Sequence, residues 1–359
     1  MNRYNKNLDM TLKWIEKTFD EHGGSSAHYS RFLGWSKPYP ETTGYLITTL
    51  LNAYEFKKEV KYKKLAIKAG YWLLSIQNDD GSFPGGLYSK HKKNSPSVFN
   101  TGQIIDGLVE LSKFEQNDYW LNAAEKSAIW LGEGVKEDGT WVVGNYQKSF
   151  NPSYYSQVAW PMLRVWKRTN NNLIKEKAVK ALSHICKKTS KNGEIIDWGF
   201  KPNEPAFTHT IAYTLRGIIE SAIILDKWDD FGFYTEKAIN KFYRLSELKN
   251  GRLPGSFKKG WIGDNSYSCL TGNAQIAICL MRFEHLFPDL RLINASSKLV
   301  DYVCLQQRSR GKSVGAVGGS SPIWGKYMFL RYPNWAAKYH ADALMLLTKR
   351  LEFEKETNA

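Results

Sequence analysis

Two kinds of apolar run alternate along the chain. One kind is amphipathic, carries lysines on one side and ends in a turn with glycine, as in KAGYWLLSIQNDDGSFPGG from Lys68 to Gly86. The other kind is apolar nearly all round and opens on small polar residues, as in ETTGYLITTLL from Glu41. A helix that faces solvent on one side has the first pattern, and a helix buried on all sides has the second. The chain is therefore predicted to alternate outer and inner helices.

The amphipathic runs recur at a nearly constant interval. Each copy has an aromatic residue or His and a glycine nine positions after it, and in all copies but the fifth, Phe242-Tyr243, an aliphatic residue follows the first. The anchors lie 58, 58, 54, 58 and 60 residues apart. A fixed period of this kind is typical of a repeat architecture. The glycines are expected to stop the outer helices, and Thr or Ser at the start of the inner runs is expected to cap those helices. The six repeat glycines are Gly23, Gly81, Gly139, Gly193, Gly251 and Gly311.

Six copies of two helices predict an all-α fold, an (α/α)6 toroid of six outer–inner helix pairs that forms one domain over residues 1–359. An open superhelix of helix pairs is the alternative. A closed ring is favoured because all six inner runs are strongly apolar and none has the polar face of a capping repeat. The last inner helix, Asn334 to Leu351, is expected to close against the first outer helix.

The stretch from Lys68 to Phe83 resembles the repeat of squalene and oxidosqualene cyclases. It has a basic and a small residue, then Trp72 followed by an aliphatic residue, then Gln77, Gly81 and an aromatic residue at matching spacings. The resemblance implies an α/α-toroid, the architecture shared by terpenoid cyclases, protein prenyltransferase β subunits and many polysaccharide lyases, hydrolases and epimerases. It is specific for the fold rather than for the chemistry, because one ring hosts many functions.

The sequence has no feature of a secreted or membrane-spanning protein. Its first residues, MNRYNKNLDMTLKW, lack the apolar core of a signal peptide, and no apolar run approaches a membrane span. The four cysteines lie in helical runs without metal-ligand spacing. We therefore expect a cytoplasmic protein with reduced thiols and no cofactor.

Charge gathers on the connections between outer and inner helices. These connections are long, and in a ring they share one face with the N-termini of the inner helices, whose partial positive charges favour anions. They carry thirteen Lys or Arg against five acids, in a chain of net charge +15. Aromatic residues make up 14% of the chain, and flat rings beside cations suit sugars that carry carboxylates. The predicted partner is an acidic oligosaccharide or polysaccharide, with an anionic membrane surface or a lipid-linked glycan as a further one. No nucleic acid is expected, because no such motif is present.

Residues at the openings of the inner helices are expected to line the floor of a central funnel. Tyr, His and amide groups are those needed to remove a proton next to a carboxylate, which leads to epimerisation or β-elimination. The predicted function is that of a carbohydrate-active enzyme, an epimerase or lyase in polysaccharide biosynthesis or modification. The candidate catalytic residues are His209, His340, Tyr154, Tyr155 and Glu41. The candidate substrate-binding residues are Asn100, Gln157, Tyr213, Lys338, Arg31, Lys92, Trp198 and Trp261.

Other functions remain open. Hydrolysis requires two carboxylates, for which Glu41 and Asp264 near the mouth, with Asp342 one turn deeper, are the candidates. An isoprenoid-handling enzyme of the cyclase or prenyltransferase type is the main alternative, and a non-catalytic binding ring is the third. The residues that line the cavity distinguish an isoprenoid site from a sugar site. An isoprenoid site would be aromatic and apolar to its floor, whereas a sugar site would be polar at the floor and aromatic at the rim.

One stretch resembles the zinc site of protein prenyltransferases. Asp264-Asn-Ser-Tyr-Ser268 is similar to their Asp-Gly-Cys-Tyr-Ser, but Ser266 stands where the ligand Cys would be. Zinc favours a thiolate at such a position. A zinc site would then need Asp264, Cys269 and His340.

Overall fold

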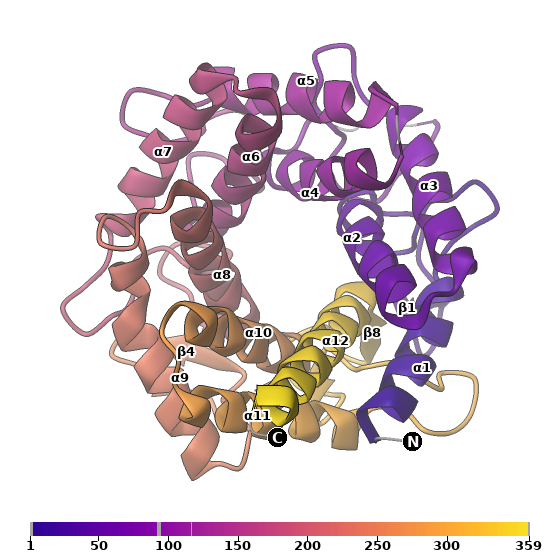
Figure 1. Ribbon diagram of the computed structural model, residues 1–359, viewed down its shortest axis with the longest axis vertical. Helices are drawn as coiled ribbons and strands as arrows, with labels where there is room; N and C mark the ends of the chain where they lie inside the picture. Colours follow the sequence, from indigo (N-terminus) through magenta and orange to yellow (C-terminus); the bar gives the residue numbers. More distant parts are fainter. Residues whose placement is uncertain (1–2, 92–94, 116, 358–359) are drawn as a thin grey trace.

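The computed structural model describes residues 3–91, 95–115 and 117–357. Within these ranges twelve α-helices form two concentric circles in a closed ring (Figure 1), which confirms the predicted all-α toroid. The inner helices are α2 (Pro40–Lys57), α4 (Val98–Phe114), α6 (Ser156–Thr169), α8 (Thr208–Leu225), α10 (Leu270–Leu286) and α12 (Asn334–Thr357). The outer helices are α1 (Arg3–Glu16), α3 (Val60–Leu74), α5 (Tyr119–Glu133), α7 (Asn172–Cys186), α9 (Glu236–Leu248) and α11 (Leu290–Gln306).

The two ends of the chain close the ring. Helix α12 starts at the predicted residue, Asn334, and packs against α1. The Tyr4 hydroxyl on α1 donates to Asp301 Oδ1 on α11 at 2.9 Å. On the loop side, strand β1 (His28–Ser30) pairs antiparallel with β8 (Arg331–Pro333). The N-terminal helix therefore completes the helix pair that the C-terminal helix begins, as the sequence predicts.

Five of the six period glycines, all but Gly311, lie where neighbouring outer helices touch. All six have positive φ angles. A Cβ atom built on Gly81 would lie 2.6 Å from the Lys126 carbonyl oxygen of α5, and one on Gly251 would lie 2.0 Å from the Lys298 carbonyl oxygen of α11. Such distances are too short for a side chain. The turn glycine therefore lets each repeat approach the backbone of the next outer helix.

A glutamine side chain binds the turn glycine and the next outer helix at this junction. Its contacts in the sixth repeat involve a different glycine from the one that the period predicts. Gln77 Nε2 lies 3.1 Å from Gly81 O and 2.9 Å from Ser127 Oγ on α5. Gln307 makes the equivalent contacts to Gly315 O at 3.1 Å and, on α1, to Thr11 Oγ1 at 2.7 Å. A Cβ on Gly315 would lie 2.0 Å from the Met10 carbonyl oxygen. Gly315, not Gly311, therefore takes the junction position in the last repeat.

Two local predictions are wrong in detail. The repeat glycines do not end the outer helices: Gly81 lies in a turn beyond Leu74, the last residue of α3. Of the small polar residues that open the inner helices, Ser97 does cap α4 by accepting from the Asn100 amide. Thr43 and Thr101 instead accept backbone amides from the preceding loop. Their hydroxyls fix the long connections to the ring.

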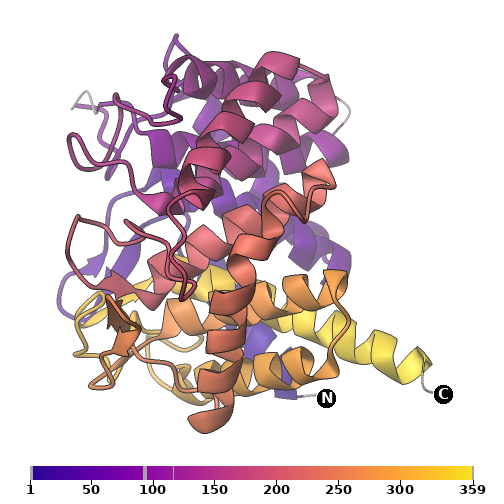
Figure 2. The same ribbon diagram turned by 90° about the vertical axis from the view of Figure 1, so that its left-hand side faces the viewer.

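The two faces of the ring differ (Figure 2). The long connections gather on one face, hereafter the loop face, and the short turns and the end of α12 lie on the other, the turn face. The remaining strands are β2 (Gly34–Trp35), β3 (Ala206–Phe207), β4 (Ser256–Lys258), β5 (Ile262–Gly263), β6 (Ser268–Cys269) and β7 (Ser320–Ser321). They build small sheets of order β2-β1-β8, β3-β4-β5 and β6-β7 that brace the loops. In the described part of the chain, no helix is both long and apolar enough to cross a membrane.

The junction predicts unequal costs for two glycine substitutions. Gly251 and Gly311 have similar φ angles, +79° and +76°, but only Gly251 faces a backbone carbonyl; a Cβ on Gly311 would meet nothing within 4 Å. Gly311→Ala should cost about 1 kcal/mol through backbone strain alone. Gly251→Ala should cost clearly more, measured as the midpoint of thermal or urea unfolding. Equal midpoints in the two variants would show that the close approach carries no stability.

Candidate functional site

The inner helices turn equivalent positions toward the axis of the ring. In each helix three residues at spacings i, i+3 and i+7 face inward, because this spacing returns to one side of an α-helix. The upper layer, nearest the loop face, is Tyr45, Gln103, Gln157, Tyr213, Gln275 and Tyr339. The middle layer is Thr48, Asp106, Trp160, Arg216, Ile278 and Asp342. The lower layer is Asn52, Glu110, Arg164, Glu220, Arg282 and Leu346.

Three tyrosines of the upper layer meet across the axis and divide the lumen. The Tyr45 and Tyr339 ring centroids are 6.1 Å apart, and those of Tyr339 and Tyr213 are 5.8 Å apart. The three residues come from α2, α12 and α8, and all are almost fully buried. We call them the tyrosine floor. On its loop-face side lies a cluster of buried aromatic and titratable side chains, here called the upper compartment, and on its turn-face side lies the lower cavity.

Glu41 lies in the upper compartment. It is 8% exposed, and burial raises the pKa of its carboxyl from 4.5 to about 7, although a hydrogen bond with Tyr39 works in the opposite direction. Its charge acts on six tyrosines that come from different segments around the ring, which places the carboxyl near the axis. These tyrosines are Tyr39, Tyr45, Tyr154, Tyr213, Tyr327 and Tyr339.

His209 lies on the other side of this compartment, on α8. Its Nδ1 is 2.7 Å from Gln275 Oε1, and its ring centroid is 4.4 Å from that of Tyr213 and 5.3 Å from that of Tyr327. An amide oxygen only accepts, so Nδ1 carries the proton and Nε2 keeps its lone pair. Burial lowers the pKa of His209 to about 4, so the ring is neutral at pH 7. Glu41 and His209 are thus two proton-transfer groups in one aromatic compartment.

Aromatic side chains from the loops and from the first turn of α4 cover the upper compartment. Phe99, Tyr154 and Phe200 follow one another at 5.2 and 5.8 Å between ring centroids. Tyr327 lies 5.0 Å from Phe207 and accepts a hydrogen bond from the Trp335 indole at 2.8 Å. Burial holds the pKa of Tyr154 and of Tyr213 well above 10, so both phenols stay protonated at neutral pH. They can donate hydrogen bonds but do not act as bases.

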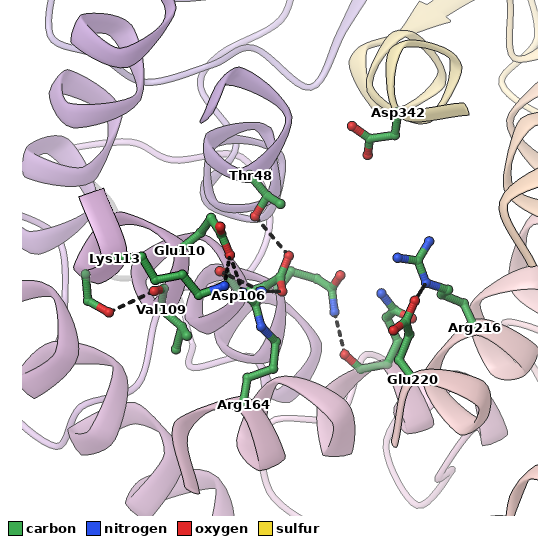
Figure 3. A network of polar contacts seen from close by, with 12 residues as sticks. Thr48, Asp106, Val109, Glu110, Lys113, Arg164, Arg216, Glu220 and Asp342 are labelled. Carbon is green, nitrogen blue, oxygen red and sulfur yellow. Dashed lines mark hydrogen bonds and ion pairs between the residues drawn. The ribbon is translucent and has the colours of Figure 1, made fainter. Parts of the chain in front are cut away.

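The lower cavity is small and charged. It has a volume of about 260 Å³, extends from the tyrosine floor toward the turn face and has the exposed Lys349 at its rim. Figure 3 shows polar contacts at and beside this cavity, with labelled residues from α2, α4, α6, α8 and α12. Arg164 forms ion pairs with both Asp106 and Glu110. The charged walls are therefore made by pairs between neighbouring inner helices.

Further ion pairs neutralise the remaining acids of this cavity. Glu220 lies between two arginines, at 2.6 Å from Arg216 Nε and 2.7 Å from Arg282 Nε. Lys338 Nζ lies 2.5 Å from Asp342 Oδ2. Burial works to raise the pKa of Asp106, but the charges of Arg164 and Lys338 and hydrogen bonds outweigh it and lower that pKa below its usual value.

The structure brings together part of the candidate set. Glu41, Tyr154, His209 and Tyr213 share the upper compartment, whereas Gln157 and Lys338 line the lower cavity. Asn100 is buried beside them, accepts from the Tyr39 hydroxyl and donates to the Pro84 carbonyl.

Two of the candidate catalytic residues point elsewhere. Tyr155 is fully buried and packs edge-on against Trp141, with 5.6 Å between ring centroids. His340 is fully buried, neither ring nitrogen has a hydrogen-bond partner among the described residues, and burial lowers its pKa to about 3. Tyr339 and Asp342 face the lumen, and one residue turns a helix by about 100°, so His340 is rotated away from the axis. The expectation that both histidines face one cavity is therefore wrong.

Of the candidate substrate-binding residues on the loops, the two tryptophans pack against neighbouring loops. Trp198 and Trp261 pack edge to face at 5.3 Å, and the Trp261 indole donates to the Asn192 carbonyl, which fixes the loops over α9. Arg31 is exposed on the loop face. Lys92 lies outside the described residues.

The proposed zinc ligands do not meet. Asp264 binds Lys326 and Ser266 on the loop face, and Cys269 is buried with a thiol pKa that burial raises to about 12. Among the described residues, no group of three His, Cys, Asp or Glu side chains could hold a metal ion. Asp264, Cys269 and His340 therefore do not form a metal site.

Apart from Asp342, sequence reasoning missed the charged residues of the middle and lower layers. The sequence does contain a signal for these residues. When the six inner runs are aligned at i, i+3 and i+7, matching positions are occupied by Asp106, Arg164, Arg216, Glu220 and Arg282. Charged residues within nearly apolar helices are otherwise hard to assign. The alignment would have placed them on the axis.

Comparison with solved structures extends over nearly the whole chain. An unsaturated glucuronyl hydrolase specific for heparin matches with a TM-score of 0.76 and 15% identity over 98% of each chain. Cellobiose 2-epimerase from Bacillus thermoamylovorans matches with a TM-score of 0.74 and 16% identity over 97% of this chain and 99% of that one. D-mannose isomerase matches with 0.74 and 14% over 97% of each. At these identities the likeness shows the shared toroid fold.

Sequence comparisons add no family. No family model matches the chain, and no curated protein matches it. The resemblance of Lys68 to Phe83 to the squalene cyclase repeat stays a prediction.

The paired charges predict a large effect of one substitution. Arg164→Met would leave Asp106 buried without its arginine and Glu110 with one ion-pair partner fewer, and should destabilise the fold by about 3–5 kcal/mol. Among the described residues, Lys113 remains as the ion-pair partner of Glu110. Lys113→Ala removes the exposed partner of Glu110 and should cost no more than about 1 kcal/mol. Urea unfolding of both variants measures the difference. A small loss for Arg164→Met would mean that the lower cavity solvates its carboxylates.

Because the pKa of Glu41 is raised, we predict that ionisation of this residue lowers the stability of the folded protein in a pH-dependent way. Between pH 4.5 and 7 the folded protein keeps a proton on Glu41 that the unfolded chain has lost, so this residue makes stability fall as pH rises through that window. Glu41→Gln should therefore stabilise the protein by up to about 3 kcal/mol at pH 8 and by nothing below pH 4.5. Thermal midpoints of both proteins across pH measure this gain. A pH-independent difference would contradict the burial of an ionisable carboxyl.

Proposed function

We propose that the chain is a carbohydrate-active enzyme that moves a proton on a sugar ring in the upper compartment. The observation that carries this proposal is the buried Glu41 with a pKa of about 7, opposite the neutral His209. A general acid or base works best when its pKa lies near the working pH. Groups whose pKa is shifted toward the working pH cluster at functional sites.

The proposed substrate is an acidic glycan. Exposed cations lie around the loop face, at Arg31, Lys90, Lys258 and Lys259, and would attract a uronate-bearing chain. One structural neighbour is described as a glucuronyl hydrolase specific for heparin, and others as sugar epimerases and an isomerase. These descriptions support a sugar substrate without naming the reaction. We place the activity in the assembly or modification of a polysaccharide.

The chemistry follows from the protonation states. Ionised Glu41 would take the proton from the ring carbon next to the carboxylate, and the electron pair would move onto the carboxylate oxygens. Protonated tyrosines, among them Tyr154 and Tyr213, would donate hydrogen bonds to those oxygens as charge develops. His209 Nε2 would accept from a sugar hydroxyl. Return of a proton from a protonated tyrosine on the opposite face would give the epimer, and the proton on Glu41 would then restore the tyrosine through solvent. Alternatively, the electron pair would form a C4–C5 double bond while the C4–O bond breaks and the proton that Glu41 took passes to the leaving oxygen, which gives the unsaturated product.

The other functions fit less well. A hydrolase needs two carboxyls about 5–9.5 Å apart around the scissile bond. Asp342 lines the cavity on the other side of the tyrosine floor and is paired with Lys338, while Asp264 lies outside the compartment. An isoprenoid site would lack the carboxyl and the His209–Gln275 pair at its centre. We therefore favour proton abstraction, giving epimerisation or β-elimination.

Proton NMR in heavy water tests this proposal. Incubation with uronate oligosaccharides should place deuterium at C5 or produce an olefinic proton, and Glu41→Gln should lower this rate by at least about 100-fold. Glu204→Gln changes an exposed acid of the loop face and is the matched control. Undiminished turnover in Glu41→Gln would overturn the role of Glu41. Release of reducing sugar without deuterium at C5 would point to hydrolysis.

A further inference from the structure

We infer that the lower cavity is a second binding site, for a small neutral polyhydroxyl compound such as a single sugar ring or a polyol. The cavity is separated from Glu41 by the tyrosine floor and extends to the opposite face of the ring. The inference rests on the lining of the cavity and does not require the proposed function.

The first observation is a pair of acceptors that lack donors. Gln157 is 5% exposed and lines the cavity, and its Oε1 has no hydrogen-bond partner among the described residues. Asp342 gives its Oδ2 to Lys338, while its Oδ1 is likewise buried and without a described partner. Buried polar atoms are nearly always hydrogen-bonded, so two orphaned acceptors in one cavity need an explanation. A ligand that donates hydrogen bonds supplies it.

The second observation is that the charged side chains of the cavity walls already form ion pairs with one another. Asp106 is paired with Arg164, Glu220 with Arg216 and Arg282, and Asp342 with Lys338. A charged ligand would lose its hydration without gaining a free countercharge inside. Lys349, the exposed cation at the rim, remains in water. Hydroxyl groups suit this lining better than a carboxylate or an ammonium group.

The third observation is size and shape. Pockets for drug-sized ligands measure about 300–1,000 Å³, so a cavity of about 260 Å³ fits a smaller molecule. Three aromatic residues, Tyr45, Tyr339 and Trp160, contribute to the wall. Their apolar faces can cover the C–H side of a sugar ring while the amides of Asn52, Gln103 and Gln157 bind its hydroxyls. An oligosaccharide would have to extend past Lys349 into solvent.

Titration calorimetry with D-glucose, D-mannose, D-glucuronate and D-glucosamine tests the site. At the site that Gln157 lines, glucose or mannose should bind more tightly than either charged sugar. Gln157→Leu should weaken that binding about tenfold, because a hydroxyl then loses its acceptor. Asn52→Leu, at a partly exposed position that tolerates substitution, should weaken it as well if Gln157→Leu does not fold. Glu41→Gln lies above the tyrosine floor and should leave the affinity unchanged, which separates this site from the proposed catalytic one.

Each other outcome overturns the inference. Tighter binding of glucuronate or glucosamine that Gln157→Leu weakens and Glu41→Gln leaves unchanged would show that the lower cavity is made for a charged ligand. Binding that survives both Gln157→Leu and Asn52→Leu would lie elsewhere on the molecule. Absence of heat for glucose and mannose up to their solubility limits would mean that solvent alone satisfies the orphaned acceptors.

Discussion

The ring depends on the close contact between each turn glycine and the backbone of the next outer helix. From Gly23 onward this contact recurs at every step round the circle, and Gly315 against Met10 makes the final one. A side chain at any of these junctions would push neighbouring repeats apart. Small displacements at six successive junctions would add up, and the circle would open into a superhelix. Closure is therefore a cumulative property of backbone contacts that leave no room for a Cβ.

Because the glycine contacts are alike at each step, the inner helices are aligned at the same height around the ring. This alignment determines which residues face the axis. Positions i, i+3 and i+7 of every inner helix form three layers, so each repeat contributes one residue to each layer. The helices of the scaffold repeat, but the residues that face the axis differ from one repeat to the next. Three tyrosines fill the upper layer from α2, α8 and α12, and alternating Glu and Arg on α4, α6, α8 and α10 pair in the lower one. Chemistry thus varies by substitution within a fixed geometry, which explains how one ring can host different activities.

Much of this fold could be predicted from the sequence, because its period is carried by residues with one physical role. The glycine frame and the two types of apolar run predict the helices, their alternation and the closure of α12 on α1. The exception is the last junction, where four inserted residues move the role from Gly311 to Gly315, as the contacts of Gln307 and the close approach of Gly315 to Met10 reveal. The loops were less predictable, since their small sheets pair strands such as β1 and β8 that lie about 300 residues apart.

The candidate site was predictable only in part, for a reason of geometry. Counting from the helix openings identified Glu41 and His209, but it assigned His340 to the lumen although a rotation of one residue turns it away. It also overlooked the layers deeper in the ring, because position along a helix was considered without the direction of the side chains. Where six helices share an axis, the residue facing that axis recurs with the helical period, and adjacent positions are not equivalent.

Burial, rather than the helix ends, dominates the electrostatics of the upper compartment. The N-termini of six inner helices surround it, and each such terminus favours a nearby anion by about 0.3–1 kcal/mol. Glu41 nevertheless has a pKa raised to about 7, a shift of opposite sign worth about 3 kcal/mol. The partial charges point toward the site, but the tyrosines and loop aromatics keep out the water that would stabilise a carboxylate. The compartment therefore holds a proton that can be exchanged near neutral pH, which is the property that proton transfer on a sugar requires.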